Sequence, residues 1–414
     1  MRSALRSAVS MFLNNRAVLR NALRPTKKNT VVSLLLIAVA TPLTLIVSIA
    51  LVSRRVMRRP LRLIVLPIGS EFSFLVRFLE HLRGSPPKDR EFDAVLALSK
   101  WRHRTLTALY KREFRCQIIW TDGLWGLVQQ ALLTQPNFLV ERKRLPFQDV
   151  WKNFNLPLVP LREPPHLIET KFNVLQELNM TDKEYVAVSV HTRTYDEQRN
   201  PHYASKGKKK ESSGSGLANA VDLLTSRHLG VIRLGSPDVG EAHIPRDIPR
   251  LEDFGALGGA HEVALASGCK YFWSDGAGAM WLSYPFHRPV MFTNQYSIAL
   301  RVDVMKMWNE RDIPHLVLPI RFETSLGSRL TFRDELQSPP LFKKLEELVW
   351  IRNSSEELVD AHKEMLARLD GSWVETTSMR EIRSRFENIY VGYPHVIRPF
   401  VATTFLMKHT YLLE

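Results

Sequence analysis

The sequence predicts an α/β protein with two domains that face each other, preceded by an apolar N-terminal segment. From residue 61 onward, short apolar and β-branched runs alternate with stretches of helical spacing, which indicates parallel sheets covered by helices. Three of the later runs end abruptly in charged, hydroxyl or glycine residues. A single uncharged stretch, residues 31–52, stands in front of all of them.

The composition sets limits on the class of protein. A chain of 414 residues has room for two ordinary domains, and 45% hydrophobic with 24% charged residues is typical of a globular protein. The net charge of +15 favours acidic partners. Zinc-finger spacing and an aromatic-basic RNA-binding signature are both missing, which disfavours nucleic acid. The two cysteines form no CxxC pair, which excludes a metal knuckle or a disulfide framework.

The uncharged stretch is long enough to cross a bilayer. We therefore expect a basic segment at 1–30 and a transmembrane or re-entrant membrane segment at 31–53, with anionic lipid as the acidic partner. Arginine and lysine residues flank the stretch on both sides, so the positive-inside rule gives no orientation. Pro42 lies mid-segment, where it can kink a helix. A single span and a hairpin both remain open.

The first domain is expected over residues 60–165. Its apolar runs predict strands at 61–66, 92–98 and 116–120. The runs of helical spacing between and after them predict helices at 71–82, 101–111 and 124–133. Four prolines in 157–165 predict a linker at the end of this domain.

The second domain is expected over residues 170–345, with a helix and a return segment at 346–414. Strands are predicted at 185–191, 231–234, 270–273 and 290–293. Helices are predicted at 168–178, 217–227, 261–266 and 278–284. The lysine-rich insertion 196–216 predicts a surface loop, either an ordinary solvated loop or a basic lid over phosphates.

Polar residues gather where these strands end. His191 and Arg193 follow an apolar strand and, two residues apart, project the same way. Arg233 and Gly235 stand at the end of the next strand. A third strand runs into the turn 274–278. Because ligands of open α/β sheets bind at the carboxyl ends of strands, this pattern predicts a site for an anionic, phosphate-bearing ligand.

These strand ends also resemble those of a known protein family. The matching motifs are His191-x-Arg193, Gly230-Val-Ile-Arg233-Leu-Gly235, Ser274-Asp-Gly-Ala-Gly278, Arg288-Pro289-Val290, Thr293-Asn294, Leu318-Pro319, Leu330-Thr331 with Glu335, Asn353-Ser-Ser-Glu-Glu357, Glu364-Met365 and Ile68-Gly69. In order and spacing they look like a family of bacterial glycosyltransferases with the GT-B fold, distantly similar to fucosyltransferase-like enzymes that use an H-x-R strand end. The resemblance covers residues 60–371 and implies two facing Rossmann-like domains, the first for the acceptor and the second for the nucleotide-sugar.

The resemblance implies roles for individual residues. Arg193 would contact the donor diphosphate, where a guanidinium gives bidentate bonds that strengthen as the leaving group gains charge. His191 would orient Arg193 or polarise the sugar, or it is a satisfied buried histidine. The general base is not identifiable, and Asp253 is one candidate beside Asp196 and Glu197.

The residues expected to bind the donor are Arg233, Gly235, Ser274, Asp275, Gly276, Gly278 and Asn294. An interdomain ion pair is the alternative for Arg233. Backbone N–H groups of the turn 274–278, at the start of the predicted helix, would hold phosphate without metal. Asp275 would contact ribose or base, or cap the helix.

The sequence therefore predicts a membrane-anchored glycosyltransferase, a hexosyl- or deoxyhexosyl-transferase, that moves a sugar from a nucleotide-sugar to a glycan or lipid-linked acceptor, as in polysaccharide biosynthesis. No Asp-x-Asp occurs, so neither a metal nor a cofactor beyond the donor is expected. The catalytic domain is expected on the cytoplasmic face, with a lumenal location as the alternative. A competing hypothesis is a catalytically degenerate GT-B scaffold or a nucleotide-binding membrane assembly protein.

Overall fold

The computed structural model describes part of the chain: residues 61–65, 76, 79–80, 83, 92–97, 105, 108–110, 117–120, 140–144, 159–189, 214–235, 248–249, 251, 259–275, 278–295, 308–309, 312–337, 348–393 and 398–414. The predicted segments 1–30 and 31–53 lie outside these residues. Within the described ranges, no helix has the length and apolarity needed to cross a membrane. The chain divides into two compact units, Met1–Asn153 and Phe154–Glu414. The five predicted domain boundaries stay predictions.

The N-terminal unit contains a four-stranded parallel sheet. Its strands are β1 (Leu61–Val65), β2 (Phe92–Ala97), β3 (Gln117–Trp120) and β4 (Val140–Arg144), in the order β3-β2-β1-β4. All five residues of β1 pair with β2 on one side and β4 on the other. This order, with the first strand inside and a crossover to the fourth, is the order of one half of a doubly wound Rossmann sheet.

The C-terminal unit contains a five-stranded sheet that is parallel throughout. Its strands are β5 (Tyr185–Ser189), β6 (Gly230–Arg233), β7 (Tyr271–Ser274), β8 (Val290–Gln295) and β9 (His315–Pro319). They lie in the order β6-β5-β7-β8-β9. Counted within the unit, this is the order 2-1-3-4-5 of flavodoxin-like doubly wound folds. The prediction of an α/β class with parallel sheets is thereby confirmed.

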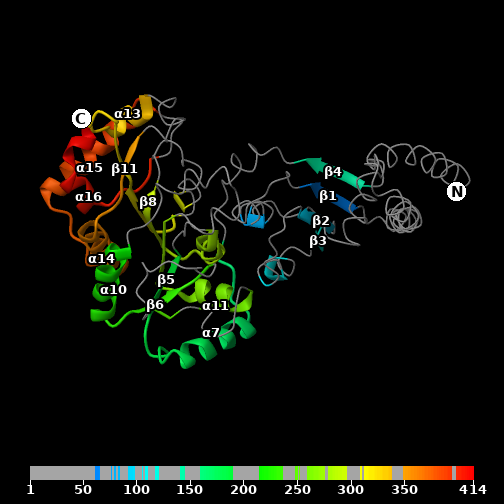
Figure 1. Ribbon diagram of the computed structural model, residues 1–414. Coiled ribbons are helices and arrows are strands. Elements are labelled where there is room, and N and C mark those ends of the chain that lie inside the picture. The colour runs from blue at the N-terminus through cyan, green and yellow to red at the C-terminus, as the bar shows by residue number, and fades with distance from the viewer. Residues whose placement is uncertain are drawn as a thin grey trace, which may run out of the picture. The chain divides into compact units, whose positions relative to one another are not determined.

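Helices cover both faces of this sheet (Figure 1). Helices α10 (Gly214–Ser226) and α14 (Ser355–Leu369) pack together on one side, and α7 (Pro165–Glu177) and α11 (Ala260–Gly268) pack together on the other. Side chains on alternate strand positions connect to the two layers. The Tyr185 hydroxyl donates to the Leu265 carbonyl of α11 at 2.7 Å, whereas the Tyr271 hydroxyl lies 2.5 Å from His362 Nδ1 of α14. The fold is therefore a three-layer αβα sandwich.

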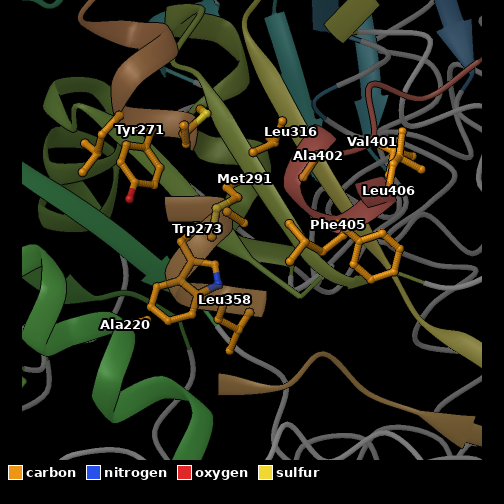
Figure 2. Close-up of a cluster of buried hydrophobic side chains, with 14 of the residues drawn as sticks. Ala220, Tyr271, Trp273, Met291, Leu316, Leu358, Val401, Ala402, Phe405 and Leu406 are labelled. Carbon is orange, nitrogen blue, oxygen red and sulfur yellow. The ribbon is translucent and has the colours of Figure 1, made fainter. Parts of the chain in front are cut away.

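The C-terminal segment belongs to the core of this unit. Helices α15 (Thr377–Ile389) and α16 (Thr403–Lys408) and the 3₁₀ helix η5 (Thr410–Leu413) contribute side chains to one apolar cluster with the sheet. Figure 2 shows Phe405 and Leu406 of α16 in the same cluster as Trp273 and Leu316. Each such side chain stabilises the fold by about 1.5–3 kcal/mol relative to an exposed one. The return segment is thus structural.

The remaining elements connect β9, the last strand of the five-stranded sheet, to α14. Strands β10 (Arg321–Glu323) and β11 (Val349–Ile351) form an antiparallel pair, and α13 (Phe332–Gln337) lies between them in sequence. Ser354 and Glu357 form a capping box at the start of α14, in which each side chain binds the other residue's backbone N–H.

Candidate functional site

The candidate site is the carboxyl edge of the C-terminal sheet, between β5 and β7. Strand β5 is followed by the connection to β6 on one side, and β7 by the connection to β8 on the other. Where adjacent connections diverge in this way, a crevice opens beyond the strand ends, and ligands of doubly wound sheets bind there. The predicted site residues that the structure describes are Arg233, Gly235, Ser274, Asp275, Gly278 and Asn294. His191, Arg193, Asp253 and Gly276 lie outside the described residues.

Polar side chains end the strands that flank this point. Ser189 and Ser274 are the last residues of β5 and β7, and they pair in register across the switch point. Both are buried, and Asp275 directly after β7 is only 9% exposed. Asp275 and Ser274 each make contacts within the protein. Hydroxyl and carboxylate groups therefore stand at the carboxyl ends of these two strands, where the apolar side chains of the sheet end.

Arg233 is the last residue of β6 and is 4% exposed. Its backbone N–H donates to the Pro249 carbonyl at 3.0 Å, and this hydrogen bond joins strand β6 to the segment around Pro249. A guanidinium buried to this degree requires compensating partners, because an isolated charge is costly away from water. Arg233 does interact within the protein. In the strand register Arg233 pairs with Val188 of β5, one residue before the end of that strand.

Gly235 brings the loop after β6 over the end of β5. Its φ of +113° lies in a region that residues with a side chain rarely adopt. A Cβ built on Gly235 would lie 3.0 Å from Ser189 Oγ and 3.9 Å from Ala279 Cβ. Three segments therefore converge here: the end of β5, the loop after β6 and the turn after β7. Of the donor residues expected from sequence, this geometry brings Gly235 close to Ala279, the residue that follows Gly278.

The predicted helix 278–284 is not an α-helix. The structure has two short 3₁₀ helices, η2 (Gly278–Leu282) and η3 (Tyr284–Phe286), joined at Ser283. Pro285 removes a backbone donor, and its neighbours Tyr284 and Trp281 are buried in an aromatic cluster with Trp308. A five-residue 3₁₀ helix has a small dipole, so it does not provide the helix N-terminus that was expected to bind phosphate. A Cβ on Gly278 would meet no atom within 4 Å, so there is open space beside this turn.

Asn294 is held by a partner from a distant part of the chain. Its backbone N–H donates to Asn353 Oδ1 at 2.6 Å, and Asn353 N–H donates to Asn294 Oδ1 at 2.9 Å. Asn353 Nδ2 also donates to the Pro319 carbonyl at 3.0 Å. The side-chain oxygen of Asn294 therefore joins β8 to the start of α14.

Other motif residues also have structural contacts. Arg288 Nε donates to the Ser267 carbonyl, and its guanidinium lies 3.5 Å from Glu163, at the amino end of β8 and away from the carboxyl edge. Thr331 and Asp334 bind each other's backbone N–H or side chain at the start of α13. Asn353 to Glu357 supplies the clamp to Asn294 and the capping box of α14.

Ser189 was missed from the sequence. The signal was a single hydroxyl residue in the otherwise apolar run 185–190, two positions before His191. In the described part of the chain, no group of three or more His, Cys, Asp or Glu residues is arranged to hold a metal ion. The expectation that no metal or cofactor takes part stays a prediction.

Comparisons with known proteins give weak similarities to solved structures. No protein-family model and no curated protein matches the chain. Its structure is similar to a glycosyl transferase family 9 protein from Veillonella parvula DSM 2008, with 11% identity over 75% of this chain and 97% of that one and a TM-score of 0.43. It is similar to ADP-heptose LPS heptosyltransferase II from E. coli, with 13% identity over 75% and 99% and a TM-score of 0.40. For the iron-containing heptosyltransferase TibC, the identity is 11% over 75% and 77%, with a TM-score of 0.36. At these values the topology and the residues of the chain itself must carry the functional argument.

Proposed function

We propose that this protein is a glycosyltransferase that transfers a sugar from a nucleotide-sugar to a glycan or lipid-linked acceptor, with the donor bound at the carboxyl edge of the C-terminal sheet. The observation that carries the proposal is the switch point between β5 and β7, where Ser189, Ser274 and Asp275 end or follow the strands. The sequence adds His191 and Arg193 directly after β5. A second parallel sheet of Rossmann-like order in the N-terminal unit supports the GT-B arrangement.

In this proposal two arginines stabilise the negative charge of the diphosphate. Arg193 contacts the diphosphate. Its fixed positive charge stabilises the leaving nucleoside diphosphate as the bond between the anomeric carbon of the sugar and the diphosphate breaks. Arg233 contributes its charge from below the edge. A carboxylate or imidazole, with Asp253 and His191 as candidates, removes the proton of the acceptor hydroxyl. The proposal requires no divalent metal, because no Asp-x-Asp occurs in the chain.

The proposed enzyme is anchored in a membrane. The support is the uncharged stretch 31–52 with arginine and lysine on both flanks. We propose the cytoplasmic face for both units, since cytosolic nucleotide-sugars would then reach the site. The full chain is expected to stay with the membrane fraction after an alkaline carbonate wash, and a chain lacking residues 31–53 is expected to be released. Protease added to sealed, right-side-out cells tests on which face of the membrane the two units lie. The full chain is expected to be protected, and its digestion would contradict the cytoplasmic location.

Donor binding is tested on the full chain in detergent. The melting temperature is measured with ADP, GDP, UDP and CDP in the presence of EDTA, for the wild type and for Arg193→Ala. One nucleotide is expected to raise the melting temperature by several degrees through mass action, and Arg193→Ala is expected to abolish that rise. Arg227→Ala is the matched control, because Arg227 is exposed at the far end of α10.

Two outcomes separate the competing functions. Release of the nucleoside diphosphate from the corresponding nucleotide-sugar, dependent on Arg193, supports an enzyme. Binding without any release, over a panel of glycan and lipid acceptors, would support a catalytically degenerate scaffold instead. A folded wild-type protein that binds none of the nucleotides would overturn the proposal.

A further inference from the structure

Residues 159–164 begin the described part of the C-terminal unit and lead into α7. In the structure this connecting segment packs onto the unit. Leu161 is only 6% exposed, and its backbone N–H donates to the Pro285 carbonyl of η3 at 2.8 Å. Val159, at the outer end of the segment, is 72% exposed. The chain is therefore attached to the C-terminal unit from Leu161 onward.

Prolines restrict the backbone of the connecting segment. The proline ring fixes φ at positions 160 and 164, and each proline confines the residue before it to extended conformations. Pro164 has φ −72° and ψ 155°, and Pro165 opens α7 directly after it. No side chain caps the amino end of α7. The angle at which the segment enters the helix therefore depends on contacts other than a cap.

Glu163 supplies such contacts through both of its carboxylate oxygens. Oε2 lies 2.5 Å from Lys171 Nζ of α7, and Oε1 lies 3.5 Å from Arg288 Nη2, just before β8. The Glu163 side chain is 15% exposed, so salt screens these pairs less than pairs at an open surface. Arg288 is itself held by the Ser267 carbonyl of α11, to which its Nε donates. The carboxylate thus ties the connecting segment to α7 and to the amino edge of the sheet.

These ion pairs lie far from the strand ends that are proposed to bind the donor. Arg288 precedes β8, whereas Ser274 and Asp275 lie at the carboxyl end of the neighbouring strand β7. The two ends of a parallel sheet are opposite edges of the unit. A change at Glu163 is therefore not expected to remove a contact to the donor.

We infer that Glu163 is a positioning residue: its ion pairs with Lys171 and Arg288 fix the direction in which the chain leaves the C-terminal unit toward the N-terminal unit. The consequence for catalysis rests on the proposed function. Transfer requires the reacting atoms of acceptor and donor to come within about 3–3.5 Å of each other, and the sequence resemblance implies that the acceptor binds the first domain. A fixed direction leaves fewer arrangements of the two units to compete with the productive one.

The first test measures the distance between the units by pulsed electron paramagnetic resonance on the full chain. Spin labels are attached through Ala108→Cys in the N-terminal unit and Lys363→Cys in the C-terminal unit, both at exposed positions. Cys116 is replaced by serine, and Cys269 is buried. Adding Glu163→Gln or Glu163→Ala is expected to broaden the distance distribution.

Glu184→Gln is the matched control. It removes an ion pair with Lys270, 2.7 Å long, from the same edge of the sheet without touching the connecting segment. This variant is expected to keep the distribution of the labelled parent protein. An unchanged distribution in both Glu163 variants would overturn the inference. Equal broadening in Glu184→Gln would also overturn it, because it would indicate a general loosening of the unit.

The second test separates positioning from a merely structural role. The kcat for sugar transfer is expected to fall about tenfold or more in Glu163→Gln and Glu163→Ala, while the dissociation constant of the nucleoside diphosphate stays at the wild-type value. Glu163→Asp keeps the charge and is expected to restore part of kcat. Wild-type kcat in both neutral variants would overturn the positioning role. A wild type that binds no nucleotide would remove the proposed function, and the distance measurement would still decide the inference.

Discussion

Asn294 and Asn353 exchange two hydrogen bonds, in which the backbone N–H of each residue donates to the side-chain oxygen of the other, at 2.6 and 2.9 Å. The pair joins residues 59 positions apart, at the end of β8 and just before α14. Asn294 adopts a left-handed φ of +48°, which asparagine tolerates better than most residues. The pair therefore fixes how the last helical layer is joined to the sheet.

Removing this clamp is expected to destabilise the protein strongly. Asn353→Ala leaves the Asn294 N–H and the Pro319 carbonyl without their partners, and each buried unsatisfied group costs about 1–3 kcal/mol. We expect a loss of roughly 2–4 kcal/mol in urea unfolding. Asn388→Ala, at an exposed position near the end of α15, is the control and is expected to change stability little. Equal stability of the two variants would contradict the structural role of the clamp.

The same pair shows where sequence reasoning reaches its limit. Thr293-Asn294 at a strand end resembles a site motif, and a single sequence does not reveal that Asn353 lies beside it. The apolar strands β5, β6, β7 and β8 were predicted within one or two residues of their described ends, because buried parallel strands are continuous apolar runs.

Two strands, β4 and β9, were not predicted from the sequence. Strand β4 reads Val-Glu-Arg-Lys-Arg, a sequence without an apolar run, and lies at the edge of its sheet, where charged residues are common. Strand β9 is apolar, but it follows Pro314 and ends in Pro319, and prolines are typical of turns. The helix expected at 278–284 failed because Pro285 and aromatic packing favour 3₁₀ turns. Convergence of Gly235 on Ser189 depends on a backbone conformation that composition does not encode.

Buried His362 makes stability depend on pH. Burial lowers the pKa of His362 to about 3, because its imidazole packs edge-on against Trp273 at 4.4 Å and only the Tyr271 hydroxyl reaches Nδ1. In the unfolded chain the imidazole has a pKa of about 6.5, so below that pH it binds a proton that it does not bind in the folded protein. Stability from this group is complete above pH 6.5 and is lost as the pH falls toward 3. The expected loss between pH 7 and pH 5 is roughly 2 kcal/mol.

The variant His362→Asn isolates this contribution. Asparagine places an oxygen near the position of Nδ1, so the Tyr271 hydroxyl keeps an acceptor, but the side chain does not titrate. Urea unfolding at pH 7 and pH 5 is expected to show a smaller pH dependence for the variant than for the wild type. The same drop in both proteins would show that other groups cause it.

Glu357 connects three segments through its carboxylate. Its Oε1 lies 3.0 Å from Arg321 Nη2 and 2.5 Å from His409 Nε2, and its Oε2 accepts from Ser354 N–H at 2.7 Å. Burial alone would raise the pKa of Glu357, but the hydrogen bonds from His409 and Ser354 and the charge of Arg321 outweigh it and lower the pKa. The carboxylate therefore stabilises the fold above its unfolded pKa, and this contribution is lost as the pH falls through the folded pKa.

Glu357→Gln is expected to cost about 1–3 kcal/mol at pH 7, the range for hydrogen bonds to a buried charged group. The difference from wild type is expected to shrink as the pH falls, because the wild-type carboxylate then becomes protonated. Glu356→Gln is the adjacent control, because Glu356 is 80% exposed and pairs with Lys408 at the surface. Chemical unfolding at pH 7 and pH 3.5 measures both. A difference that does not change with pH would mean that the carboxylate charge is not what stabilises this contact.

Glu364 anchors the C-terminal helix to the core. Its fully buried carboxylate accepts from the backbone N–H groups of Thr403 and Thr404 at 3.0 and 2.9 Å, and from Arg368 Nη2 at 2.9 Å. Glu364→Gln replaces one oxygen with a donor that faces N–H groups and leaves Arg368 without its charged partner on α14. Arg368 keeps Glu375 at 3.1 Å, so the main cost is the lost hydrogen bonds to the buried carboxylate, about 1.5–3 kcal/mol. We expect a loss of that size, with hydrogen exchange accelerated first in α16. Glu381→Gln, exposed on α15, is the control. If α16 amides exchanged at the wild-type rate in Glu364→Gln, the apolar contacts of Phe405 and Leu406 alone would be sufficient to hold the helix in place.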